Sequence, residues 1–285
     1  MIALAEQKFS DAGLYYGHGT DNPADEAAYL ILRSLGLPFD ASAKDLDEPL
    51  QPQLEARLLV LIERRVSERI PVAYLINEAW FAGLPFYVDQ SVLVPRSPLA
   101  ELIEERFNPW LHEAGVQRIL DIGTGSGCIA IACAHAFPDA MIDANDIDTA
   151  VLAIASRNIE RYQLSRRVHL YQANVFQGMP PARYDLILSN PPYVSTAEMG
   201  KLPAEYQQEP ATALSAGMDG LDVVRTILRQ AGSYLAEHGV LIVEVGNSQA
   251  AVMENFPGIP FTWLEFERGG EGVFLLTAAD LKAHL

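Results

Sequence analysis

From about residue 99 to the C-terminus, segments with strand character alternate with segments with helical character, and this alternation constrains the fold most. Short apolar runs bounded by turn residues predict strands, and apolar residues at helical spacing predict helices. The expected strands are 118–122, 141–145, 168–172, 184–189 and 239–245, and the expected helices are 99–106, 128–136, 149–162 and 222–236. Such alternation predicts a doubly wound, mainly parallel sheet with helices on both faces.

The last two expected strands, 261–267 and 272–277, are close neighbours in the sequence, with Gly269 and Gly270 between them. A short glycine turn allows two strands to pair as an antiparallel hairpin. We therefore expect an antiparallel last strand at one edge of the otherwise parallel sheet. The predicted fold class is α/β.

The first part of the chain shows helical spacing, which predicts a small N-terminal helical domain over residues 1–74. One helix is expected over 25–36, with Asn22 or Asp21 as its N-cap, and another over 51–66. We expect this domain to take part in substrate recognition.

Arg64, Arg65 and Arg69 gather at the end of the second of these helices. A charge run on a helix is usually a solvated face, and we predict one here. The aromatic-rich stretch 79–89 contains a Gly-Leu-Pro break, which predicts a β-hairpin. This hairpin, in a linker over 75–95, is expected to join the helical domain to a second domain over 96–285.

The composition excludes several classes of function. Acidic residues outnumber basic ones by 37 to 20, and a formal net charge of −17 repels phosphate backbones and attracts basic proteins. The sequence has no run of about 18 uncharged apolar residues and no basic leader segment, so we expect neither a membrane span nor secretion.

Cys128 and Cys133, five positions apart in an expected helix, suit neither a disulfide nor a metal site. They are predicted to be small core residues in a reducing cytoplasm, and no metal is expected.

A glycine-rich stretch, Asp121-Ile122-Gly123-Thr124-Gly125-Ser126-Gly127, follows the first expected strand of the sheet. Glycines permit a tight turn and let backbone N–H groups approach a ligand, and the crevice where such a strand meets its helix binds nucleotides. The glycine spacing is G-x-G-x-G. The dinucleotide fingerprint G-x-G-x-x-G would need a glycine where Cys128 stands, which disfavours a nicotinamide cofactor.

Two aspartates follow the second expected strand of the sheet. Asp146 lies about 20 residues beyond the glycine stretch, where a carboxylate often accepts hydrogen bonds from ribose hydroxyls. Asp148 is expected to cap the next helix. A capping role is the alternative for Asp146 as well.

The tetrapeptide Asn190-Pro191-Pro192-Tyr193 follows the apolar run 184–189 and is the most informative motif. The Asn190 side chain and the Pro191 carbonyl are two acceptors on a backbone stiffened by prolines, and Tyr193 can offer its ring to a substrate. These groups can hold a planar NH2 by its hydrogens and leave its nitrogen facing a reagent. The alternative is a Pro-Pro turn, with Asn190 in a turn-stabilising bond and Tyr193 in the core.

Taken together, Asp121-x-Gly123-x-Gly125-x-Gly127, Asp146 and Asn190-Pro191-Pro192-Tyr193 resemble the motifs of class I S-adenosylmethionine-dependent methyltransferases. That family has a seven-stranded sheet with a reversed last strand, and the Asn-Pro-Pro-Tyr variant is similar to that of enzymes that methylate an amide or exocyclic NH2. The resemblance implies S-adenosylmethionine as cofactor. It implies cofactor contacts for Asp121, Gly123, Thr124, Gly125, Gly127, Asp146, Asn174 and Asn190, substrate contacts for Asn190, Pro191, Pro192 and Tyr193, and catalytic roles for Asn190, Pro191 and Tyr193.

From about residue 65 onward the chain resembles the HemK-type protein-glutamine N5-methyltransferases, and most of all the PrmB branch, whose substrate is the large-subunit ribosomal protein L-three. The segments that carry this likeness are 79–81, 86–88, 94–98, 125–132, 244–248, 261–266 and 269–274. Residues 95–101 lack the threonine of the release-factor branch, which favours a basic ribosomal protein as partner. Asn174 stands where many relatives have Asp, and it could accept from the adenine amino group more weakly.

The residues alone leave two other functions open. A nucleic-acid methyltransferase acting on adenine N6 or guanine N2 would use the same acceptors, but it would need a basic groove for a flipped base, which the charge of −17 disfavours. A non-catalytic S-adenosylmethionine-binding assembly factor would have no evident use for both acceptors. Glu244 and Asn247, at the end of a further strand, could touch substrate or cofactor. We interpret them instead as satisfied loop groups.

Overall fold

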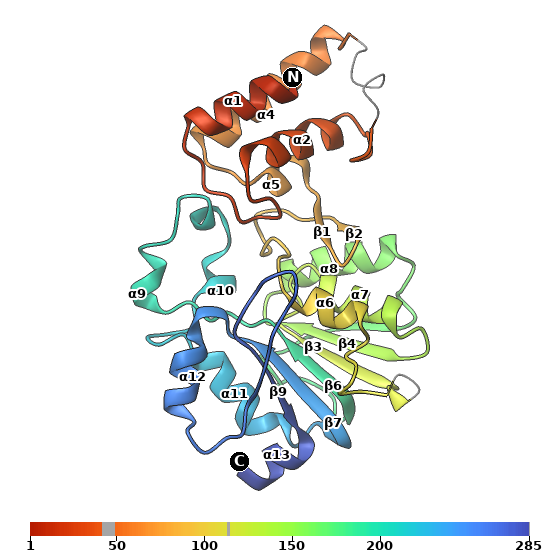
Figure 1. Cartoon of the computed structure of the whole chain (residues 1–285). Helices are drawn as coiled ribbons and strands as arrows, with labels where there is room; N and C mark the ends of the chain where they lie inside the picture. Colours follow the sequence, from red (N-terminus) through yellow and green to blue (C-terminus); the bar gives the residue numbers. More distant parts are fainter. Residues whose placement is uncertain (42–48, 113–114, 285) are drawn as a thin grey trace.

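The computed structural model describes residues 1–41, 49–112 and 115–284. A seven-stranded sheet flanked by helices forms the larger part, and the N-terminal helices lie together at one end of the molecule (Figure 1). Residues 42–48 of the expected helical domain, and 113–114 and 285 of the expected second domain, lie outside this description. None of the helices within the described ranges is both long enough and apolar enough to span a bilayer.

The N-terminal helices pack around a core of their own. They are α1 (Ile2–Asp11), α2 (Pro23–Ser34), α4 (Pro52–Ser67) and α5 (Val72–Ile76). Phe9, Leu30 and Ile62, one from each of the three longer helices, are fully buried in the same cluster. The side chain of Asn22 accepts from the backbone N–H of Asp25 over 2.9 Å, so Asn22 is the N-cap of α2.

A two-stranded hairpin follows these helices, as the sequence predicts. Strands β1 (Ala79–Phe81) and β2 (Leu84–Phe86) pair antiparallel. Phe81 and Phe86 are buried in the same cluster as Ile119 of the main sheet. From the other side, the hydroxyl of Tyr29 in α2 donates to the carbonyl of Glu78 over 2.6 Å. The hairpin therefore contacts both parts of the molecule.

The main sheet has the strand order β5-β4-β3-β6-β7-β9-β8. Its strands are β3 (Arg118–Ile122), β4 (Met141–Asp146), β5 (Val168–Gln172), β6 (Tyr184–Ser189), β7 (Leu235–Glu244), β8 (Thr262–Leu264) and β9 (Val273–Thr277). The five strands from β5 to β7 in this order pair in parallel, whereas β9 is antiparallel to both β7 and β8. The expected doubly wound sheet with a reversed last strand is confirmed.

Helices cover both faces of this sheet (Figure 1). Residues of α6 (Leu99–Glu104), α7 (Cys128–Ala136) and α8 (Thr149–Arg161) share one buried cluster, and residues of α11 (Asp222–Ala231), α12 (Gln249–Asn255) and α13 (Ala278–His284) share another. Within β6, Leu186 and Leu188 belong to the first cluster and Ile187 to the second, since side chains alternate along a strand. Cys128 and Cys133 are free and buried in the first cluster, as expected.

The chain reverses its direction of travel across the sheet between β3 and β6. It runs outward from β3 to β4 and β5, and then returns to the other side of β3 as β6. In open α/β sheets, ligands bind in the crevice at the carboxyl ends of the strands at such a switch point. Both motifs predicted to bind ligand begin there, because one follows β3 and the other follows β6.

The largest errors in the expected boundaries lie at two places in the chain. The helix expected to reach residue 236 ends at Ala231, and β7 already begins at Leu235, because the N–H of Tyr184 in β6 binds the carbonyl of Tyr234 and draws the chain into the sheet. The strand expected over 261–267 is only Thr262–Leu264. Beyond it the N–H of Glu267 donates to the carboxylate of Glu101 in α6 instead of to β9.

The segment after the Asn-Pro-Pro-Tyr motif reaches back to the N-terminal helices. We call residues 195–214 the clasp; it contains α9 (Thr196–Met199), the 3-10 helix η2 (Tyr206–Gln208) and α10 (Ala211–Leu214). Val194 and Ser215 form a bridge at its base, which closes it into a loop. Near its tip, Glu205 accepts from the backbone N–H of Tyr15 over 3.0 Å.

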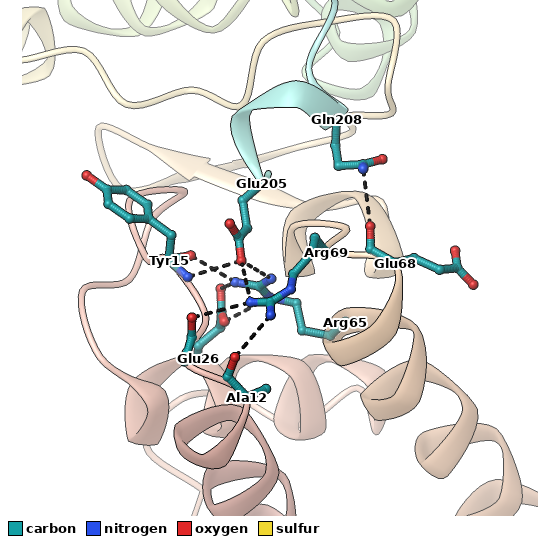
Figure 2. Close-up of polar contacts among 9 residues, drawn as sticks. Ala12, Tyr15, Glu26, Arg65, Glu68, Arg69, Glu205 and Gln208 are labelled. Atoms are coloured by element: carbon teal, nitrogen blue, oxygen red, sulfur yellow. Dashed lines mark hydrogen bonds and ion pairs between the residues drawn. The ribbon is translucent and has the colours of Figure 1, made fainter. Parts of the chain in front are cut away.

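The prediction that Arg64, Arg65 and Arg69 form a solvated face was wrong for its central member. Arg65 is 0% exposed and lies between two buried carboxylates, 3.0 Å from Glu26 and 3.4 Å from Glu205 (Figure 2). Arg69 also contacts Glu205 over 3.4 Å, and only Arg64 points to solvent with an i,i+4 partner. The helix face is buried because the clasp, far away in the sequence, folds against it.

Candidate functional site

The glycine loop leaves β3 and folds back beside the end of β4. Gly123 and Gly125 have φ values of +72° and +56°, a region that favours glycine, and a Cβ on either would meet no other part of the protein within 4 Å. The N–H of Gly125 donates to Asp146 Oδ2 over 3.2 Å. The loop backbone therefore borders open space, as a loop that cradles a ligand requires.

Asp121 is fully buried behind this loop. Its Oδ2 accepts from the Thr124 hydroxyl over 2.6 Å and from the N–H of Ala130 over 3.2 Å, and Gly127 between them is the N-cap of α7. Burial raises the pKa of Asp121 to about 7. Asp121 and Thr124 hold the loop in shape, and a direct contact of either with a cofactor stays a prediction.

Asp146 ends β4 where the sequence places it. Its Oδ1 accepts from the N–H of Asp148 over 3.1 Å, and burial raises its pKa. Asp148 caps α8 as predicted, since its side chain accepts from the first turn of that helix. Asn174 follows β5 in a tight turn paired with Gln177, and its exposed side chain makes no hydrogen bond to the described residues. Contacts of Asp146 and Asn174 with a nucleoside stay predictions.

The Asn-Pro-Pro-Tyr motif starts beside the glycine loop. Ser189 pairs with Ile122 across the sheet, and its hydroxyl donates to the Ile122 carbonyl over 2.9 Å, so Gly123 and Asn190 leave adjacent strands side by side. Asn190 is half-buried and Pro191 is buried. Among the described residues, none forms a hydrogen bond with the Asn190 side chain or the Pro191 carbonyl. The turn-stabilising side-chain bond considered for Asn190 is not made, so both acceptors are available to a ligand.

Tyr193 is held on three sides. Its hydroxyl donates to Glu244 Oε1 over 3.3 Å, and its carbonyl accepts from the Ser248 hydroxyl over 2.8 Å. A Cβ at Gly246, in the 3-10 helix η3 (Gly246–Ser248), would lie 2.8 Å from the Tyr193 ring. A glycine is therefore required at 246 for the ring to lie where it does. Burial raises the pKa of Tyr193, so its hydroxyl stays protonated.

Glu244 joins Tyr193 to the segment before α6. It lies at the carboxyl end of β7, is buried, and accepts from the Ser97 hydroxyl over 2.5 Å as well as from Tyr193. Burial raises the pKa of Glu244 to about 7, although the bonds from Ser97 and Tyr193 oppose this. The side chain of Glu244 is satisfied, as we interpreted it from the sequence, whereas Asn247 is exposed.

The shifted pKa of Glu244 predicts a dependence of stability on pH. The pKa of the Glu244 carboxyl is 4.5 in the unfolded state and about 7 in the folded state, so between these pH values the folded state binds the carboxyl proton more tightly. The free energy of unfolding therefore falls as pH rises from 4.5 to about 7. Relative to Glu244→Gln, the wild type should lose roughly 3 kcal/mol of unfolding free energy across it. Urea unfolding of both proteins between pH 4.5 and 8 measures this difference. A difference that does not change with pH would contradict the prediction.

The same segment connects the site to the clasp. Arg96 makes a two-pronged contact with Glu209, at 2.6 Å for each nitrogen, and its guanidinium lies 4.9 Å from the centre of the Tyr206 ring. Glu209 also accepts from the N–H of Val94 over 3.0 Å. Burial acts to raise the pKa of Glu209, but His18, whose Nε2 lies 3.5 Å from Glu209 Oε2, and the bonds from Arg96 outweigh it and lower the value to about 2. Glu209 is therefore a permanent anion beside the site.

Sequence reasoning missed Ser97 and Glu209 as parts of this arrangement. Ser97 lies in segment 95–101, which the missing threonine marks as a family difference but not as a contact with Glu244. Glu209 carried no signal, because its partner Arg96 is more than 100 residues away in the chain. Both are found only when the fold brings the segments together.

Comparisons with known proteins agree with this geometry. The sequence model of the methyltransferase small domain family matches residues 106–208. A protein of Neisseria gonorrhoeae named ribosomal protein uL3 glutamine methyltransferase is 46% identical over 282 residues, covering 99% of this chain and 94% of that protein. A protein of Bordetella pertussis with the same name is also 46% identical over 282 residues, covering 99% of this chain and 95% of that protein.

Solved structures are similar in fold at low sequence identity. The catalytic domain of hMettl16, in complex with MAT2A 3′UTR hairpin 6, superimposes with a TM-score of 0.52 at 20% identity, covering 80% of this chain and 81% of that one. At this identity the likeness concerns the fold alone. The described sheet and its helices are therefore arranged as in that domain.

Proposed function

The chain belongs to the family of ribosomal protein uL3 glutamine methyltransferases, and from that membership we propose that it methylates the side-chain amide nitrogen, N5, of a glutamine in uL3. This is the large-subunit protein L-three. The methyl donor is S-adenosylmethionine. The enzyme class follows from the family, whereas the roles of individual residues are argued from the site.

One observation carries the assignment of the reacting group. Two oxygen acceptors with no partner among the described residues, Asn190 Oδ1 and the Pro191 carbonyl, lie at the switch point beside the glycine loop. A primary amide presents two hydrogens on one planar nitrogen, so two adjacent acceptors match it. A hydroxyl or a thiol has only one hydrogen to donate and would leave one of these acceptors unused.

The loop after β3 fits the adenosyl part of the donor. Gly123 and Gly125 border open space, and Asp146 keeps a carboxylate at the end of β4, where a ribose hydroxyl could donate to it. Asn174 would accept from the adenine amino group. When bound, S-adenosylmethionine supplies an electrophilic methyl group.

The protein contributes alignment and charge stabilisation. An amide nitrogen is a poor nucleophile because its lone pair is delocalised into the carbonyl. By accepting both hydrogens, Asn190 and Pro191 direct the nitrogen and stabilise the positive charge that develops on it. Positioning of this kind can lower a barrier by roughly 7–11 kcal/mol in favourable systems, and acceptors aimed at the developing charge add to that.

The proton leaves after the nitrogen has gained its methyl group, when the charged amide has become strongly acidic. No His or Lys belongs to the motifs that form the site, so solvent or a nearby acceptor takes this proton. Tyr193 lines the substrate side chain and is kept in place by Glu244 and Ser248. We therefore assign Tyr193 a positioning role alongside the two acceptors.

The N-terminal helices and the hairpin form the part that recognises the substrate protein. The net charge of −17 favours a basic protein such as a ribosomal one and disfavours direct binding of nucleic acid. Free buried cysteines fit a reducing cytoplasm as the location, and we expect no membrane partner.

Methyl incorporation tests the proposal. The purified enzyme with labelled S-adenosylmethionine should methylate uL3, and mass spectrometry of uL3 from cells that lack the enzyme should show the loss of one methyl group. Ribosomal RNA and tRNA are offered in parallel. Label in nucleic acid would favour a nucleic-acid methyltransferase, and S-adenosylmethionine binding without turnover would favour a non-catalytic assembly factor.

A further inference from the structure

A cavity of about 450 Å³ lies between the helical domain, the hairpin and the segment that leads to the site. Ala28, Tyr29 and Leu32 of α2, Trp80 of β1, and Val94 and Pro95 contribute to its walls. Its size is within the range of pockets that hold small ligands. None of the residues that line it has a role in the methyl transfer.

Two aromatic rings at this cavity are exposed yet fixed in place. Phe39 is 51% and Trp80 is 37% exposed, and their rings meet edge to face at 5.4 Å. The Trp80 indole donates to Glu78 over 3.1 Å, while Arg33 contacts both carboxylate oxygens of Glu78 and lies 5.7 Å from each ring. The salt bridge neutralises Arg33 and holds the rings in one arrangement. Exposed rings kept in position in this way are typical of a binding surface.

The mouth of the cavity is acidic. Asp25 lines it, and an adjoining hollow that shares Gly19, Thr20 and Asp25 is also lined by Asp21. The Asn22 amide donates to both carboxylates, at 2.6 Å and 2.7 Å, which holds them near one another. In the described part of the chain neither aspartate has a Lys, Arg or His partner within salt-bridge distance. Two exposed carboxylates therefore remain available to a cation from outside.

The cavity is close to the candidate site. Pro95 lines the cavity, and Ser97, two residues later, donates to Glu244, which also binds Tyr193. Two residues of extended chain span at most about 7 Å. Two residues of chain and two hydrogen bonds thus connect the cavity wall to Tyr193, so we expect a polypeptide that presents a glutamine at Asn190 to pass this cavity.

We propose that this cavity receives an arginine or lysine side chain of the substrate protein, near the methylated glutamine. The inference rests on the function proposed above and adds a recognition site to it. The aliphatic stem lies against Tyr29, Leu32 and Trp80, and the cationic head meets Asp25 and Asp21. Aromatic faces and carboxylates together favour a cation over a neutral or acidic side chain.

Two enzyme variants test the two halves of the site. The double substitution Asp21→Asn/Asp25→Asn removes both charges but keeps the oxygens that accept from Asn22. Ala28→Trp fills the cavity from α2. Each should raise the KM for uL3 about tenfold, the effect of losing roughly 1.4 kcal/mol of binding. The kcat and the affinity for S-adenosylhomocysteine should stay within about twofold of wild type.

Matched controls separate a local contact from a general effect. Glu6→Gln/Glu55→Gln removes two exposed charges elsewhere on the helical domain, and Ala56→Trp places the same ring on an exposed position of α4. Both controls should keep the wild-type KM, and thermal unfolding checks that all variants are folded. An unchanged KM in both test variants would overturn the proposal, as would an equal rise in KM in the charge control. If wild-type enzyme does not methylate uL3 at all, the proposed function itself fails instead.

A double-mutant cycle identifies the occupant. Each arginine and lysine of uL3 near the modified glutamine is changed to glutamine and assayed with wild-type enzyme and with Asp21→Asn/Asp25→Asn. At one such position, the substitution in uL3 should raise the KM of the wild-type enzyme but change the KM of the aspartate variant much less. The two effects on KM are then non-additive, because the aspartate variant has already lost the contact. Full additivity at every position would show that no basic side chain meets these aspartates, and the proposal would be withdrawn.

Discussion

Asn190→Ala is expected to lower kcat for uL3 methylation by at least about 10²–10³-fold, the range found when one preorganised group that stabilises developing charge is removed. The substitution deletes one of the two acceptors and leaves the Pro191 carbonyl alone. The amide nitrogen can then rotate about its single remaining hydrogen bond. Affinity for S-adenosylhomocysteine should change less than about threefold, since the glycine loop and Asp146 are untouched.

The measurement is single-turnover methyl transfer together with calorimetric titration of S-adenosylhomocysteine. Asn247→Ala is the matched control, because Asn247 is an exposed asparagine in η3, three residues beyond the end of the neighbouring strand β7. That control should keep near-normal kcat. Near-normal turnover in Asn190→Ala would defeat the mechanism, and a large loss of cofactor affinity would mean that Asn190 serves the donor more than the substrate.

Arg65→Ala is expected to cost about 3–5 kcal/mol of unfolding free energy, the range for removing one partner of a buried ion pair. Arg65 is fully buried between Glu26 and Glu205, so its loss leaves two carboxylates without their main counter-charge. Burial already raises the pKa of Glu26 even with Arg65 present. The penalty should therefore shrink at low pH, where Glu26 can take up a proton.

Urea unfolding and limited proteolysis of the clasp measure the effect. Arg64→Ala is the control, because Arg64 is one position away on the same helix, is exposed, and forms an i,i+4 pair with Glu68; its cost should be no more than about 1 kcal/mol. The triple change Arg65→Met/Glu26→Gln/Glu205→Gln removes all three buried charges together and should recover part of the stability. Equal costs for Arg65→Ala and Arg64→Ala would show that the buried network contributes little.

Local patterns in the sequence were enough to predict the sheet and the position of the two loops that we expect to bind ligand. Strands such as 118–122 and 184–189 are short apolar runs bounded by turn residues, and glycines or prolines follow directly. The side-by-side placement of Gly123 and Asn190 then follows from the strand order of the class. For α2 the sequence left two candidate N-caps, Asn22 and Asp21, because both residue types are favourable caps. Only the backbone conformation of the folded chain shows that Asn22 is the N-cap.

Contacts between distant segments could not be predicted. Arg65 looks like part of a solvated run because arginine is usually exposed, and its burial depends on Glu205, 140 positions later. Likewise the bond from Ser97 to Glu244 joins residues 147 positions apart. Such pairs leave no periodic trace in a single sequence, since neither partner alters the local spacing of apolar residues.

The clasp begins just after the Asn-Pro-Pro-Tyr motif and packs against the N-terminal helices. Those helices therefore cannot be exchanged between related proteins as an independent domain. A chimera that takes residues 1–76 from another protein would set a foreign side chain at position 65 against the resident Glu205, and a foreign loop against Tyr206. The smallest transferable unit is discontinuous: it consists of the N-terminal helices together with residues 201–209 from the same parent.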